Sequence, residues 1–309
     1  MNIRDARVQL AALGLLLLIN VACPMVVRAE GPLVLRLLGG RLPVVPVYIE
    51  GQGPFEFLLD TGTNSTIVTP EVAARLGLRP ADRVRLITVA GERDVPRARL
   101  RRVAVGGSVA SDVEALVSGL EQIRRLDRRV CGVLGQNYLG RFNYTLDYGA
   151  RTIEFEGAGD APPAGERVTF DVEEGKLVVA AFSESYVRAL RLVLDAAATS
   201  LVIFEDVRGS LGPADSKGGA GRVLTEAGSL GAGLARLRSL RVGGTRLRDV
   251  PVALVSDAAG RESRAEDGLL PTSLFRAVYF NHAGGYVIFN PGQSTRAREG
   301  GLMTRARAS

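Results

Sequence analysis

The chain has 309 residues, of which 46% are hydrophobic and 23% are charged, a composition typical of globular proteins. It contains a single histidine, His282, two cysteines, Cys23 and Cys131, and no tryptophan. Zinc sites need three or four protein ligands, usually His or Cys, so this composition argues against such sites, and a Ser-His-Asp triad has only His282 to use. We expect no metal and no other cofactor. If the protein is a hydrolase, carboxylates are the expected catalysts.

The net charge of +6 lies mainly at the two ends of the chain. Residues 1–29 contribute +2, residues 292–309 contribute +3, and subtracting both from +6 leaves +1 for the body between them. A nearly neutral body does not match the electrostatic footprint of a nucleic-acid-binding protein. We therefore predict no nucleic-acid partner.

The N-terminal segment, residues 1–29, has the pattern of a secretory signal peptide. Arg4 and Arg7 precede an apolar run from Val8 to Val27, and small residues follow. This pattern predicts export, to the periplasm or outside the cell. The alternatives are an uncleaved membrane anchor and lipid attachment at Cys23. We expect any membrane contact to come through this segment alone.

The chain contains one long internal repeat. Five motifs of the first half recur in the second half in the same order, at offsets of 134 to 137 residues. The pairs are Phe57-Leu58-Leu59-Asp60 and Thr66-Ile67-Val68 with Leu192-Val193-Leu194-Asp195 and Leu201-Val202-Ile203, Thr88-Val89-Ala90-Gly91 with Thr225-Glu226-Ala227-Gly228, Val105-Gly106-Gly107 with Val242-Gly243-Gly244, Gly132-Val133-Leu134 with Gly268-Leu269-Leu270, and Ile153-Glu154-Phe155 with Val287-Ile288-Phe289. A repeat of this length indicates a duplicated structural unit.

The repeat divides the chain into a signal peptide (1–29), an N-terminal lobe (30–157), a linker (158–165), a C-terminal lobe (166–291) and a tail (292–309). The linker is rich in Pro, Gly and Ala, and the tail is rich in Arg, Ala and Gly without apolar periodicity. These compositions predict a flexible connection and a disordered end.

Within each lobe the apolar runs are short and separated by Gly, Pro and Asp, which predicts strands and hairpins. The first predicted hairpin joins 44–49 to 55–59 through a turn at 51–54. One helix follows, with Thr69 as its N-cap, Pro70 in its first turn and Gly77 after its end. The glycine-rich stretch 209–233 is interpreted as a long mobile loop. The expected fold is all-β with two lobes.

Asp60-Thr61-Gly62 is the motif with the clearest chemical meaning. Asp-Thr-Gly alone is also a common surface turn. Here apolar runs flank it on both sides, and the whole unit recurs about 135 residues later. A surface turn requires neither feature.

At these residues the sequence resembles the retropepsin-like and pepsin-like aspartic proteases, specifically their exported bacterial relatives with a duplicated lobe. Gly132-Val133-Leu134-Gly135 is similar to the family's apolar-apolar-Gly segment. The resemblance covers roughly residues 40–291. It implies a peptide or protein substrate, and two aspartates, one from each lobe, that activate one water molecule. It makes Asp60 the catalytic residue of the first lobe, supported by Thr61, Gly62 and Thr63, and Asp195 that of the second.

The second copy of the motif is incomplete. Asp195 remains, but Ala196 stands in place of the threonine and Ala197 in place of the glycine. The missing hydroxyl removes a hydrogen bond worth about 0.5–1.5 kcal/mol, and an alanine forced to a positive φ would cost about 1 kcal/mol or more. Either change is able to misplace a carboxylate.

The Thr-x-Ala-Gly segments lie where the family has flap hairpins over its cleft. The residues that this resemblance assigns to flaps are Thr88, Ala90, Gly91, Thr225 and Gly228. A purely structural hairpin in each lobe is the alternative.

Three functions fit these observations. The first is a monomeric aspartic peptidase that uses Asp60 and Asp195. The second is a peptide-binding protein that kept the cleft but lost the chemistry. The third is a homodimeric enzyme in which two N-terminal lobes meet.

Overall fold

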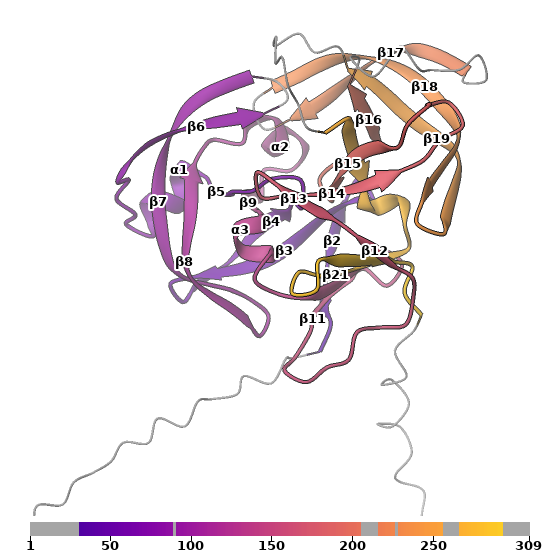
Figure 1. Cartoon of the computed structure of the whole chain (residues 1–309). Helices are drawn as coiled ribbons and strands as arrows, with labels where there is room; N and C mark the ends of the chain where they lie inside the picture. Colours follow the sequence, from indigo (N-terminus) through magenta and orange to yellow (C-terminus); the bar gives the residue numbers. More distant parts are fainter. Residues whose placement is uncertain (1–30, 89–90, 205–215, 226–227, 256–265, 293–309) are drawn as a thin grey trace, which may run out of the picture.

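The computed structural model of the protein describes residues 31–88, 91–204, 216–225, 228–255 and 266–292. Most of the described chain forms strands in two similar lobes, which confirms the predicted two-lobed all-β fold. The lobes lie side by side above a third sheet (Figure 1). The predicted signal peptide, Ala90 and all of the predicted tail except Gly292 lie outside the described residues.

The first lobe is built on an eight-stranded sheet in the order β2-β3-β4-β9-β5-β8-β7-β6. Strand β9 pairs in parallel with β4 and antiparallel with β5, so it separates two strands that follow each other in the chain. The strands are β2 (Arg36–Leu38), β3 (Leu42–Ile49), β4 (Gln52–Leu59), β5 (Thr66–Val68), β6 (Asp82–Thr88), β7 (Gly91–Val105), β8 (Ser108–Val117) and β9 (Val130–Leu134). The hairpin predicted from 44–49 and 55–59 is confirmed by the β3–β4 pair.

The second lobe repeats this sheet strand for strand, in the order β13-β14-β15-β20-β16-β19-β18-β17. Strand β20 again lies between two consecutive strands, parallel to β15 and antiparallel to β16. The strands are β13 (Asp171–Glu173), β14 (Lys176–Ala181), β15 (Leu190–Asp195), β16 (Leu201–Phe204), β17 (Ser216–Thr225), β18 (Gly228–Val242), β19 (Thr245–Val255) and β20 (Gly268–Pro271).

The prediction of a loop over 209–233 is wrong for its described part. Residues 216–225 form β17, and the chain from 228 onward belongs to β18. Glycine has a low strand propensity, which favours a loop in sequence-based reasoning. Here the hydrogen bonds of the ladder with a long neighbouring strand outweigh that preference.

A third, six-stranded sheet joins the two halves in the order β1-β11-β10-β21-β22-β12. Its central pair matches Tyr144 with Phe280 and Leu146 with Val278. At the repeat offset of 134 residues, Val278 is the counterpart of Tyr144, and Phe280 is the counterpart of Leu146. Exchanging the two halves therefore turns one of these pairs into the other. Such self-matching contacts are what a twofold axis requires. The strands are β1 (Leu33–Val34), β10 (Tyr144–Asp147), β11 (Thr152–Phe155), β12 (Arg167–Thr169), β21 (Ala277–Asn281) and β22 (Tyr286–Phe289).

Helices are few and short among the described residues. The predicted helix is confirmed as α1 (Pro70–Arg75), in which Thr69 Oγ1 accepts a hydrogen bond from Val72 N and Gly77 follows the end with a positive φ. Two further helices, α2 (Glu121–Leu126) and α3 (Gln136–Leu139), and one 3₁₀ turn, η2 (Thr272–Leu274), were not predicted. They are too short for a periodic apolar pattern. None of the described helices is long and apolar enough to span a bilayer.

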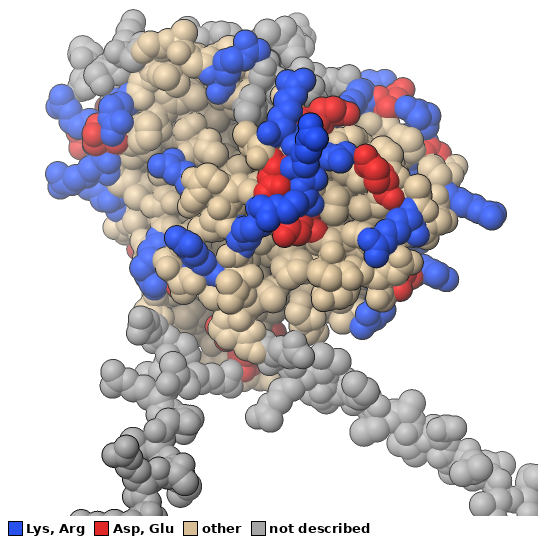
Figure 2. Space-filling model, turned by 180° about the vertical axis from the view of Figure 1, so that it is seen from behind, with Lys and Arg blue, Asp and Glu red and all other residues tan. Residues whose placement is uncertain are grey.

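Charged side chains cover the surface with both signs close together. Figure 2 shows basic and acidic groups beside one another over one face of the molecule, including its central band. Ion pairs such as Arg97 with Asp82 and Arg188 with Asp267 join groups of opposite sign. The mixed surface agrees with the nearly neutral body deduced from the sequence.

Candidate active site

The loop after strand β4 carries Asp60, whose side chain is buried. This loop must cross the end of β9 to reach β5, and Asp60 N donates to Leu134 O of β9 at 3.1 Å. Gly62 N donates to Asp60 Oδ1 at 2.7 Å, which closes a tight turn around the carboxylate. A backbone N–H held on a carboxylate in this way stabilises and orients its charged form.

The loop after β15 repeats this geometry around Asp195, which is also buried. Ala197 N donates to Asp195 Oδ1 at 2.7 Å, the same bond at the same length as in the first loop. The turn that holds the carboxylate is therefore present in both lobes. The loss of the Thr and Gly residues from the second motif does not remove it.

The conformational penalty considered for Ala197 does not arise. Neither Gly62 nor Ala197 has a positive φ, so an alanine fits the turn without backbone strain. The left-handed conformation that would make an alanine costly is absent at this position in both loops.

Gly62 has a different role, which is close approach between the lobes. A Cβ atom added at position 62 would lie 2.7 Å from Asp195 Cγ and 2.9 Å from its Oδ2, well inside van der Waals contact. The same residue therefore binds the Asp60 carboxylate through its N–H and lies so close to the Asp195 carboxylate that no side chain fits between them. One glycine brings the two acidic loops together.

Thr61 fastens the two loops to each other. Its buried Oγ1 donates to Leu194 O at 2.8 Å and accepts from Ala196 N at 2.9 Å. Ala196 occupies the matching position in the second loop. It has no side-chain hydroxyl, so it makes no equivalent hydrogen bonds to the first loop. The threonine hydrogen bonds between the two loops are thus made from the first lobe only.

Gln136 is a supporting residue that sequence reasoning missed. Its Nε2 donates to Thr61 O at 3.1 Å, and its backbone N donates to Thr63 O at 2.9 Å. It is the first residue of α3, directly after the Gly132-Val133-Leu134-Gly135 segment. Its place next to a motif already recognised is the signal that points to it.

In the second lobe the counterpart of Gln136 is Thr272, which is fully buried. Its Oγ1 shares a 2.6 Å hydrogen bond with the hydroxyl of Tyr148, a residue that precedes β11 in the first half. Burial raises the pKa of Tyr148 above its ordinary value, and the negative charge of nearby Asp195 raises it further. A tyrosine from one half thus lies beside the acidic residue of the other.

The two Thr-x-Ala-Gly segments both end hairpins. Thr88 pairs with Gly91 at the end of β6–β7, and Thr225 pairs with Gly228 at the end of β17–β18. Ala90 lies outside the described residues. The structure therefore shows the paired hairpins that the flap interpretation requires.

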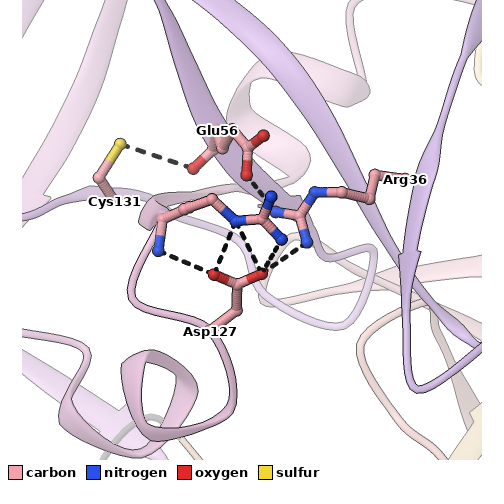
Figure 3. Close-up of polar contacts among 5 residues, drawn as sticks. Arg36, Glu56, Asp127 and Cys131 are labelled. Carbon is pink, nitrogen blue, oxygen red and sulfur yellow. Dashed lines mark hydrogen bonds and ion pairs between the residues drawn. The ribbon is translucent and has the colours of Figure 1, made fainter.

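Cys131 lies near the start of β9, beside Glu56 in the middle of β4. Its Sγ contacts Glu56 O at 3.6 Å, next to a network in which Arg36 joins Glu56 to Asp127 (Figure 3). Burial raises the pKa of the Cys131 thiol, which makes it a poor nucleophile at neutral pH. We interpret the ion pairs around Cys131 as structural.

His282 is enclosed by the rings of Tyr144, Phe170 and Phe280. Its Nε2 is buried without a hydrogen-bond partner, and burial lowers its pKa to about 4. Within the described part of the chain, no group of three or more His, Cys, Asp or Glu side chains is arranged to hold a metal ion. Asp60 and Asp195 therefore stay the candidate pair of this site.

A family model described as aspartyl protease matches the chain twice, at residues 45–138 and 183–274. Together these matches cover about three fifths of the chain. The chain belongs to the aspartyl protease family. No curated protein matches it by sequence.

Membership of the aspartyl protease family agrees with the duplication found in the sequence, because one model fits each half once. Both matches include the acidic loop, the flap-like hairpin and the segment after β9 or β20. The membership supports aspartic peptidase activity in general.

Proposed function

We propose that the protein is an aspartic endopeptidase that hydrolyses peptide bonds in a cleft between its two lobes. The observation that carries this proposal is the position of Gly62, which donates a hydrogen bond to Asp60 and lies so close to Asp195 that an added Cβ atom would clash with it. Two carboxylates held close together do not both ionise cheaply, so the pair retains one proton over an acidic range of pH.

In the proposed reaction, the ionised carboxylate takes a proton from water, whose oxygen attacks the peptide carbonyl carbon. The protonated carboxyl group gives its proton to the carbonyl oxygen, and a tetrahedral diol forms. The C–N bond then breaks as the protonated carboxyl group gives its proton to the amine nitrogen, while the other carboxylate takes a proton from one hydroxyl of the diol. This step leaves a carboxylic acid and an amine and restores the single proton of the pair. The N–H groups of Gly62 and Ala197 keep one oxygen of each carboxylate in place throughout.

Supporting roles follow from the contacts around the two acids. Thr61 ties the loops together, and Thr63 connects the first loop to α3 through Gln136. We assign the flap function to the hairpin ends at Thr88, Ala90 and Gly91 and at Thr225 and Gly228, which would cover a bound peptide.

We further propose that the protein acts as an exported monomer. The charge and apolar pattern of residues 1–29 supports export. The contact between Gly62 and Asp195 supports the monomer, because both acids belong to one chain. In this view residues 30–157 and 166–291 are the two lobes of one enzyme.

Cleavage of a diverse peptide library by the purified protein across pH 3 to 7 tests the activity, with products identified by mass spectrometry. We expect cleavage on the acidic side of this range, reduced at least about 100-fold by Asp60→Asn. Equal cleavage by this variant would reject Asp60 as the catalyst. Peptide binding without cleavage by the unaltered protein would support the binding-protein alternative.

A further inference from the structure

One face of the first flap-like hairpin joins an apolar cluster beside the acidic loops. The cluster includes Leu58, Leu86 and Leu120, and Ala197, two residues after Asp195, packs against it. We call this surface the first flap face. Because Ala197 belongs to the second acidic loop, the first flap face borders the proposed catalytic centre.

Arg93 places a cation on this apolar face. It lies directly opposite Leu86 in the β6–β7 ladder, and opposite residues of an antiparallel pair project to the same side of a sheet. Its Nη2 donates to Ser118 Oγ at 2.5 Å, whereas its Nε is buried and has no partner. Within the described residues, no carboxylate is paired with this guanidinium.

The second lobe shows what the duplicated fold places at the same positions. Leu230 pairs with Val223 as Arg93 pairs with Leu86, and Val255 stands where the first lobe has Ser118. These second-lobe residues form an apolar cluster of their own. The arginine is therefore not required by the fold, and the two flap faces differ in chemistry at matched positions.

An arginine beside an apolar cluster, with no carboxylate paired to it in the described residues, matches a carboxylate ligand. The guanidinium is always charged, and its planar N–H fork fits both oxygens of a carboxylate. The twofold relation between the lobes places the two flap faces on opposite sides of the acidic pair. A peptide that crosses the axis would present side chains from the two sides of its scissile bond to different faces.

We propose that the cleft selects a peptide with an acidic side chain at the first flap face, bound by Arg93, and an apolar side chain at the second. This proposal rests on the peptidase function proposed above. It adds a substrate class, which is a peptide with one carboxylate beside the scissile bond.

The test uses octapeptide libraries in which one position at a time is fixed as Glu, Gln or Leu. We expect the unaltered protein to cleave the best Glu library about tenfold or more faster than its Gln counterpart, because charge-assisted hydrogen bonds are the stronger ones. Arg93→Leu should remove this preference and improve cleavage of the Leu library. The preference should also fade below about pH 4.3, where the glutamate side chain becomes protonated.

Arg83→Leu is the matched control. Arg83 lies on the same hairpin but on its opposite, exposed face, so this variant loses the same charge without touching the first flap face. Its Glu preference should equal that of the unaltered protein. Arg93→Leu is expected to fold, since Leu230 occupies the matched position in the second lobe, and Arg93→Gln provides a second variant.

Binding of the same libraries to Asp60→Asn protein separates this proposal from the peptidase function. Carboxylate-dependent binding that Arg93→Leu abolishes, without cleavage by the unaltered protein, would reject the peptidase and retain the acidic-peptide site. Cleavage without a Glu preference, or with a preference that survives Arg93→Leu, would overturn the site and leave the peptidase standing. The absence of both binding and cleavage would reject both.

Discussion

The close approach of the lobes at Gly62 leads to a quantitative prediction for Gly62→Ala. The added Cβ would lie 2.7 Å from Asp195 Cγ, about 0.8 Å short of an ordinary carbon contact of roughly 3.5 Å. Asp195 or its loop must move by about that amount. Overpacking of this kind costs about 1–3 kcal/mol, and a misplacement of about 1 Å in a catalytic site costs about 100-fold in rate.

We therefore expect Gly62→Ala to lower kcat/KM about 100-fold, equivalent to about 2.7 kcal/mol in transition-state stabilisation. The melting temperature should fall by a few degrees, at about 2–4 °C per kcal/mol. The assay is cleavage of one identified peptide at its best pH, with thermal unfolding measured on the same samples.

The duplication supplies the control, because position 197 already carries a methyl group. Ala197→Gly removes that group from the matching turn, which has no positive φ to relieve. It should cost about 0.5–1 kcal/mol in stability through chain flexibility and leave kcat/KM nearly unchanged. A Gly62→Ala variant with kcat/KM within twofold of the unaltered protein would refute the reasoning from close approach.

Three further substitutions test the surroundings of the pair. Thr61→Val removes the hydroxyl that bridges the loops and leaves two buried backbone groups unpaired, so chemical denaturation should show a loss of about 2–4 kcal/mol that Thr61→Ser largely avoids. Tyr148→Phe removes its bond to Thr272 and should cost about 1 kcal/mol in the same assay. Burial lowers the pKa of His282 from 6.5 to about 4, so the folded protein binds a proton at this residue more weakly than the unfolded chain does. The contribution of this difference to folding stability is therefore complete above pH 6.5 and is lost as the pH falls through 6.5 towards 4. The difference between the two pKa values is equivalent to about 3 kcal/mol. The fall in melting temperature between pH 7.5 and pH 4 should therefore be smaller for His282→Phe than for the unaltered protein.

The fold followed from the sequence because the duplication repeats apolar patterns at a nearly constant offset. The hairpin over 44–59 and the helix after Thr69 have strong local signals, a turn between alternating strands and a cap, and both are present. The six-stranded sheet was not foreseen. Pairing between β10 and β21 joins residues more than 130 positions apart, and no local pattern specifies such a partner.

The sequence pointed to the two aspartates of the candidate site, but not to the residues that surround them. Asp60 and Asp195 were recognised because each ends an apolar strand in a repeated motif. Gln136 and Tyr148 were missed because their roles depend on which strands meet around the loops. The close approach of Gly62 to Asp195 was not foreseen, since sequence alone does not show which loop of the other lobe lies against a glycine.

The central claim is that Asp60 and Asp195 of one chain form a single catalytic pair. The most direct measurement compares kcat/KM of Asp60→Asn, Asp195→Asn and an equimolar mixture of the two on one cleaved peptide. The account predicts that both variants lose at least about 100-fold and that mixing restores nothing. Full activity of Asp195→Asn beside an inactive Asp60→Asn would contradict it and would place the active site between the first lobes of two chains.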